Sequence, residues 1–112
     1  MHPRRVLSRV KQREGRCYEL AGKTMLVTDG WLLVHGDVNG AVGRMDHAWL
    51  LHDETVYDPV RNRALSLDLF EKRYGGRALR IYCKAELVRM LARGTWGPWT
   101  AEEEHECLAG TA

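Results

Sequence analysis

The middle of the chain constrains the fold most, because it contains three strand patterns joined by very short turns. Residues 31–38, 45–52 and 54–58 are rich in the β-branched, aliphatic and aromatic residues that favour strands. Asn39-Gly40 is typical of a hairpin connection between the first two. Connections this short join antiparallel neighbours, since parallel strands need a longer crossover. The sequence therefore predicts an antiparallel sheet, in which Pro59 ends the third strand by removing a backbone donor.

Helical patterns flank this predicted sheet. Apolar or small residues recur at helical spacing from residue 17 to about residue 28, which places Cys17 at the start of a helix. On the C-terminal side we expect a helix over 66–74, a further strand over 79–82 and a second helix over 84–92. This order predicts an α+β fold. Its antiparallel sheet has three to four strands, packed by an N-terminal cysteine-bearing helix and by C-terminal helices.

The length of 112 residues predicts a single domain. We divide it into a basic arm or short helix over 1–14, a core over 15–99 and an acidic tail over 100–112. With 45% hydrophobic and 29% charged residues, the composition is typical of a soluble globular protein. No apolar run approaches the ~20 residues that span a bilayer, so no membrane association is expected.

Cysteine content and charge bear on the cellular location and on the binding partners of the protein. Three cysteines form an odd set without metal-like spacing, which favours reduced thiols and a cytoplasmic location over a disulfide framework. The basic arm lacks the interleaved aromatic residues that stack on bases, so nucleic-acid binding is not expected. We make no prediction of the oligomeric state.

Cys17, His47 and Asp58 are the residues with the clearest chemistry. A thiol nucleophile needs a sulfur to attack, an imidazole to take its proton and a carboxylate to orient the imidazole. A helix start would favour the thiolate form of Cys17. With a turn centred near residue 53, His47 lies opposite about residue 59, and Asp58 is within one position of it. The prediction requires the helix of Cys17 to pack against the sheet face that carries His47.

The order of these residues resembles the papain-like superfamily of cysteine enzymes, especially its transglutaminase-like branch. The resemblance is carried by Cys17 at a helix start, His47-Ala48-Trp49 on one strand and Val56-Tyr57-Asp58-Pro59 on the next. It implies that Cys17 is the nucleophile, that His47 is the general base and acid, and that Asp58 orients the imidazole. Transglutaminase-like domains are usually longer, with insertions that build the substrate groove.

The chain also resembles a group of short phage and bacterial proteins of no established activity. They share the same pattern through Gly97-Pro98-Trp99, and the resemblance covers roughly residues 16–99. It adds no substrate.

Other residues are candidates for supporting roles. Papain-like enzymes often place a glutamine shortly before the cysteine, so the resemblance makes Gln12 a candidate oxyanion-hole donor. The backbone N–H of Cys17 is the alternative donor. His35 is the rival imidazole, and it is also a candidate for the pocket or for support of the site. The remaining candidates for a pocket or its support are aromatic: Tyr18, Trp49, Trp96 and Trp99.

The favoured hypothesis is a thiol hydrolase or acyl transferase acting on a peptide or protein amide through a thioester. Taken singly, Cys17, His47 and Asp58 also fit a core cysteine, a core histidine and a turn aspartate. With His35 they include zinc-ligand types, but no HExxH, CxxC or HxH spacing appears, so neither a metal nor another cofactor is expected. A catalytically silent papain-like domain that binds a phage or host protein is the alternative function, because fold does not fix function.

Overall fold

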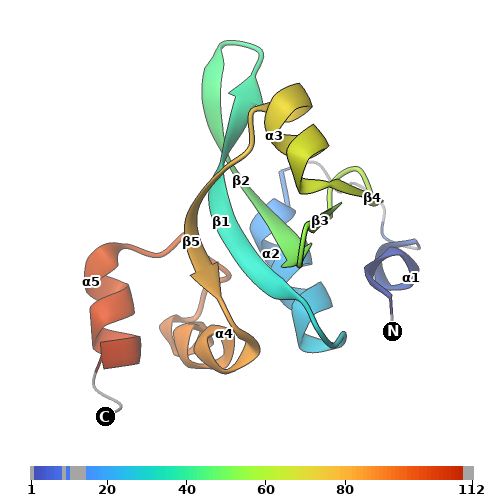
Figure 1. Cartoon of the computed structure of the whole chain (residues 1–112). Helices are drawn as coiled ribbons and strands as arrows, with labels where there is room; N and C mark the ends of the chain where they lie inside the picture. The colour runs from blue at the N-terminus through green and yellow to red at the C-terminus, as the bar shows by residue number, and fades with distance from the viewer. Residues whose placement is uncertain (1, 9, 11–14, 110–112) are drawn as a thin grey trace.

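A single antiparallel sheet of five strands organises the protein (Figure 1). The computed structural model describes residues 2–8, 10 and 15–109. In these ranges the sheet order is β4-β3-β2-β1-β5. The strands are β1 (Leu32–Gly40), β2 (Gly43–His52), β3 (Thr55–Asp58), β4 (Arg63–Ser66) and β5 (Arg77–Tyr82). The predicted α+β class and antiparallel sheet are confirmed.

The predicted strand count of three to four was too low, because β4 was not recognised. Its sequence, Arg-Ala-Leu-Ser, is short and largely exposed, and it carries no clear alternation of apolar and polar residues. It becomes a strand because β3 supplies a partner, with Val56 opposite Leu65. The turn between them contains Asn62 at a φ of 51°, a left-handed conformation that asparagine tolerates better than most residues.

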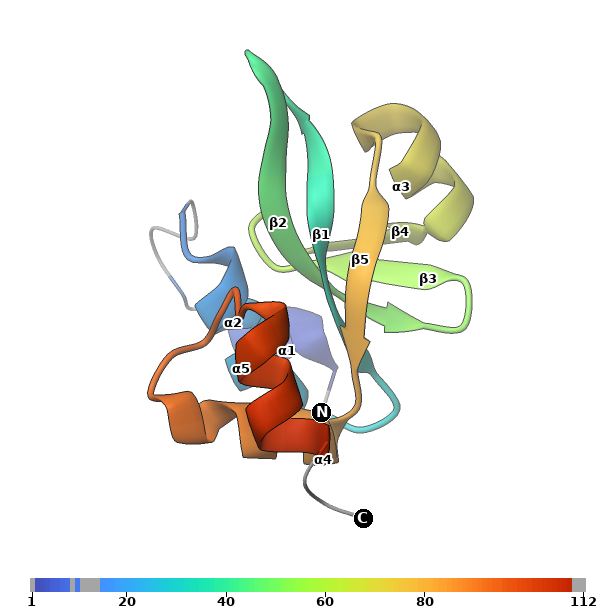
Figure 2. The same cartoon turned by 90° about the vertical axis from the view of Figure 1, so that its left-hand side faces the viewer.

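Helices cover the two faces of the sheet unequally. Figure 2 shows α3 (Leu67–Tyr74) on one side of the sheet and most of the other helices on the opposite side. The latter include α1 (Pro3–Leu7), α2 (Cys17–Leu26) and α4 (Lys84–Met90), which a 3₁₀ turn over Leu91–Arg93 extends. The acidic segment is helical, with α5 (Ala101–Glu104) followed by a π-type turn over His105–Ala109. No described helix has the length and apolar character needed to cross a bilayer.

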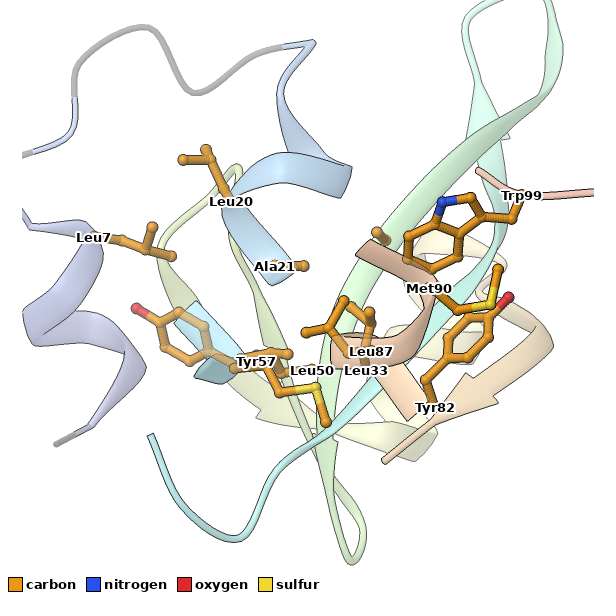
Figure 3. Close-up of a cluster of buried hydrophobic side chains, with 12 residues drawn as sticks. Leu7, Leu20, Ala21, Leu33, Leu50, Tyr57, Tyr82, Leu87, Met90 and Trp99 are labelled. Atoms are coloured by element: carbon orange, nitrogen blue, oxygen red, sulfur yellow. The ribbon is translucent and has the colours of Figure 1, made fainter. Parts of the chain in front are cut away.

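Strand alternation sorts the core into two clusters. The larger one joins the helix-rich face of the sheet to α2 and α4, with Leu33 and Leu50 among its members (Figure 3). The smaller one joins Trp49 and other residues of the opposite face to Phe70 of α3. Neighbouring residues of one strand therefore serve different cores. Leu50 belongs to the first cluster and Trp49 to the second.

We expect Phe70→Ala to destabilise the protein by about 3–5 kcal/mol, because Phe70 is fully buried in the smaller core. Leu69→Ala is the matched control, since Leu69 is the preceding residue of α3 and is exposed. Its expected cost is below ~1 kcal/mol. Urea unfolding of the two variants measures the difference. Equal costs would contradict a second core beneath α3.

Candidate functional site

Cys17 occupies the first position of α2. Its N-cap, Arg16, makes no side-chain capping hydrogen bond to the helix. The first backbone N–H groups of a helix have no acceptor within the helix, and together with the helix dipole they favour a negative charge nearby. The Cys17 side chain is half-buried and packs against the larger core. The thiol therefore sits at the helix end that best supports a thiolate or an oxyanion.

His47 and Asp58 lie in contact, as the sequence analysis expected of their side chains. His47 Nε2 is 3.2 Å from Asp58 Oδ1, and both residues are buried. The turn between β2 and β3 consists of Asp53-Glu54, and the ladder pairs His52 with Thr55 and Leu50 with Tyr57. Extending this register puts residue 60, not residue 59, opposite His47. Asp58 is thus two positions away, and an even offset keeps the two side chains on the same face of the sheet.

The Cys17 side chain lies close enough to His47 to act on the charge of its ring, so the imidazole interacts with both of the other predicted residues. The expected packing of α2 was wrong, however. The helix packs on the face of Ala48 and Leu50, whereas His47 belongs by alternation to the face of Trp49. The β2–β3 ladder ends at Leu50, and no strand in the described part of the chain pairs with that edge of β2 beside His47. This open edge gives the start of α2 access to the ring.

The charges of the site stabilise one another. Burial disfavours the His47 imidazolium, but the hydrogen bond to Asp58 and the interactions with the charges of Asp58 and Cys17 outweigh it and raise the pKa of His47 to about 9. Burial likewise disfavours the Asp58 carboxylate. Its hydrogen bonds and ion pairs with His47 and Arg61 prevail, and they hold its pKa below the ordinary value. The arrangement therefore favours a charged imidazolium beside an ionised carboxylate at neutral pH.

Arg61 is a member of the site that the sequence analysis missed. Its Nη1 donates to Asp58 Oδ2 at 2.6 Å, and the backbone N–H groups of Val60 and Arg61 donate to Asp58 Oδ1 at 3.0 and 3.3 Å. The turn that follows β3 creates these contacts. An arginine three residues after an aspartate is too common a spacing to have identified it from sequence.

His35, the rival imidazole, lies in a different environment. It is 5% exposed and surrounded by the rings of Tyr18, Tyr82 and Trp99, with centroids 4.7, 5.0 and 5.1 Å away. Burial lowers its pKa to about 4, so it is neutral at physiological pH. Its Nε2 has no hydrogen-bond partner among the described residues. The structure does not bring His35 into hydrogen-bonding contact with Cys17 or Asp58 within the described ranges.

A cleft of about 260 Å³ opens beside this aromatic cluster. Cys17, His47 and Asp58 do not line it, but the residue after Cys17 (Tyr18), the residue before His47 (Asp46) and the ladder partner of His47 (Gly36) do. The lining residues are Tyr18, His35, Gly36, Asp46, Leu79, Arg80, Tyr82, Pro98 and Trp99.

The remaining candidates occupy separate positions. Trp99 lines the cleft. Trp49 is buried in the smaller core, with its ring centroid 5.9 Å from that of His47. Trp96 packs on α2, because a Cβ added to Gly22 would come within 2.5 Å of its ring. Gln12 lies outside the described residues.

Two further observations concern ligands and relatives. Within residues 2–8, 10 and 15–109, no three His, Cys, Asp or Glu side chains are grouped as a metal ion would require. Comparisons of the chain with protein-family models, with curated proteins and with solved structures find no match. The function is therefore inferred from the geometry of this chain.

The His47 contacts predict a pH-dependent contribution to stability. The pKa of His47 rises from an ordinary 6.5 to about 9 on folding, so its contribution is complete below pH 6.5 and is lost as the pH rises through 9. The opposite sign holds for Asp58, whose contribution is lost as the pH falls below its ordinary value of 3.8. We expect His47→Gln to lower the free energy of unfolding most between pH 3.8 and pH 6.5, by on the order of 3 kcal/mol at most.

Urea unfolding of the wild type and His47→Gln from pH 4 to pH 10 tests this expectation. The difference in unfolding free energy should shrink above pH 6.5. His52→Gln, which removes an exposed imidazole at the end of the same strand and away from Asp58, is the control variant. A difference that grows with pH would mean that folding holds His47 neutral.

Proposed function

We propose that this protein is a cysteine-nucleophile enzyme that hydrolyses or transfers the acyl group of an amide, with Cys17, His47 and Asp58 as its triad. One observation carries the proposal: the buried His47 ring lies 3.2 Å from the Asp58 carboxylate and also interacts with the Cys17 thiol. A core histidine needs only one partner to be satisfied. An imidazole between a thiol at a helix start and a buried acid is the arrangement that thiol catalysis requires.

The first half of the reaction forms a thioester. The Cys17 thiolate attacks the amide carbonyl carbon, and the carbonyl π electrons move onto oxygen. The backbone N–H of Cys17, at the start of α2, is the candidate donor to that oxyanion. The His47 imidazolium then gives its proton to the leaving nitrogen as the C–N bond breaks. The raised pKa of His47 keeps this proton available at neutral pH.

The second half restores the enzyme. Neutral His47 takes a proton from water while the water oxygen attacks the thioester carbon, and collapse breaks the C–S bond. The products are a carboxylic acid and the original thiolate–imidazolium pair. An amine in place of water would give a new amide instead. Hydrolysis is the simpler outcome, since water needs no second binding site.

The cleft beside Tyr18 is the candidate site for the substrate. Burial raises the pKa of Tyr18 well above its usual range, and the negative charges of Asp46 and Cys17 act in the same direction. The Tyr18 hydroxyl therefore remains a hydrogen-bond donor. His35 forms part of the wall of the cleft. Because its pKa is lowered to about 4, it is neutral near pH 7 and holds no extra proton to give to a leaving group.

The test compares the three thiols within one molecule. Cys83 is exposed and Cys17 is only half-exposed, so accessibility alone would make Cys83 react faster with iodoacetamide. We expect Cys17 to react fastest near pH 6, where an ordinary thiol is almost entirely protonated. Peptide mass spectrometry measures each rate. An acetyl group transferred from p-nitrophenyl acetate and trapped on Cys17 would demonstrate attack on a carbonyl carbon.

Two histidine variants provide the matched control. His47→Ala should slow the labelling of Cys17 by about tenfold near pH 6 and leave Cys83 unaffected. His35→Ala should change the Cys17 rate much less. If Cys83 or Cys107 reacts fastest while Cys17 is inert in the folded protein, the enzyme proposal fails. The catalytically silent binding domain would then be preferred.

A further inference from the structure

We infer that Arg61 is a positioning residue of this site: it fixes the Asp58 carboxylate so that one oxygen is left to orient His47. The inference rests on the proposed function and extends it to a fourth residue. Asp58 is 0% exposed, and burial of an unpaired carboxylate would be costly. The residues that satisfy it therefore decide both its ionisation and its orientation.

The two carboxylate oxygens have different partners. Oδ2 accepts the 2.6 Å hydrogen bond from Arg61 Nη1. Oδ1 lies 3.2 Å from His47 Nε2 and accepts the backbone N–H of Val60 at 3.0 Å. A carboxylate held at both oxygens cannot rotate about its Cβ–Cγ bond without breaking a charge-assisted hydrogen bond. Arg61 therefore restrains the plane of the group that His47 contacts.

Arg61 is itself held in place from the other side. Its Cζ lies 3.9 Å from the centroid of the Tyr74 ring, near the end of α3. A guanidinium over an aromatic face is stabilised by the ring quadrupole, and its planar shape suits stacking better than an ammonium does. The Arg61 side chain is 43% exposed, so it reaches from the surface to a buried acid. This geometry links α3 to β3 and, through Asp58, to His47 on β2.

Charged groups from two elements of the described structure act on Asp58. His47 approaches from β2 and Arg61 from the turn after β3, and these are the charges that lower the pKa of Asp58 against the effect of burial. The Cys17 thiol approaches the other partner, His47, from the start of α2. Arg63 is the ladder partner of Asp58 on β4, but it is not among the described groups that shift the pKa of the Asp58 carboxyl. Arg63→Gln therefore removes a nearby positive charge without removing the contact.

The first measurement follows Asp58 directly. Carboxyl-¹³C NMR of aspartate-labelled protein reports the pH at which the Asp58 side chain takes up a proton. We expect Arg61→Gln to raise that midpoint by about one pH unit, the size expected for one lost charge-assisted hydrogen bond. Arg61→Lys should restore part of the shift, because it keeps the charge and loses the planar fork. Arg63→Gln should match the wild type.

The second measurement is the pH profile of Cys17 labelling by iodoacetamide. We expect its acid limb to shift by about one pH unit in Arg61→Gln, because the charge and the orientation of the Asp58 carboxylate act on His47 and, through it, on Cys17. Tyr74→Leu removes only the ring beneath the guanidinium and should shift both readouts in the same direction by less. If Arg61→Gln does not fold, Arg61→Lys and Tyr74→Leu carry the test, and no shift in either would overturn the inference.

The outcomes separate this inference from the proposed function. If His47→Ala slows Cys17 labelling while Arg61→Gln and Arg63→Gln both behave as the wild type, the positioning role is wrong and the triad stands. If Arg61→Gln lowers stability but leaves both profiles unchanged, Arg61 is merely structural and the inference again fails. If Cys17 labelling is indifferent to His47, the proposed function fails. The Asp58 titration then still decides whether Arg61 controls the carboxylate.

Discussion

Asp58 is the group on which the arrangement around the candidate site depends. A fully buried carboxylate is tolerated only when donors surround it, and here they come from β2, from the turn after β3 and from the backbone of that turn. Arg61 carries the connection on to Tyr74 of α3. Asp58 therefore connects α3, through Arg61 and Tyr74, to β2, the strand that bears His47. Replacing it would leave a histidine and an arginine without their shared partner.

The two histidines beside β1 and β2 illustrate how environment sets chemistry. His47 and His35 are equally inaccessible to solvent, at 6% and 5% exposure. His47 has an anionic partner, and its pKa rises to about 9; His35 is enclosed by the rings of Tyr18, Tyr82 and Trp99, and burial lowers its pKa to about 4. Burial acts in the same direction on both rings, so the difference comes from the charges nearby. Of these two imidazoles, His47 is the one that holds a proton near neutral pH.

The open edge of β2 explains how a helix on one face reaches a side chain of the other. The strand that would cover His47 stops at Asp58, where Pro59 follows. The shortness of β3 therefore has two consequences. The strand ends at Asp58, and the imidazole of His47 is left accessible to the start of α2. Gly22 contributes by letting Trp96 pack directly on the helix that carries Cys17.

Sequence patterns alone determined the strand hairpin, the helix that starts at Cys17 and the α+β class. These features depend on local periodicity and turn residues such as Asn39-Gly40, which act over a few positions. Strand order also sufficed to place His47 and Asp58 on neighbouring strands, but the predicted register was wrong by one residue, and only the observed register gives the even offset that puts both side chains on one face. Roles for Cys17, His47 and Asp58 in catalysis remain a proposal.

Tertiary structure decided the rest, because it depends on contacts between segments with no local signal. The strand β4 is formed by its pairing with β3. The helix α2 packs on the face of Leu50, where its apolar residues belong to the larger core. The ion pair of Arg61 with Asp58 arises from the path of a single turn. The neutral state of His35 arises from three aromatic rings that converge from α2, β5 and the segment before α5. A sequence pattern can predict which residues form a site, but burial and the neighbouring charges determine the protonation states of those residues.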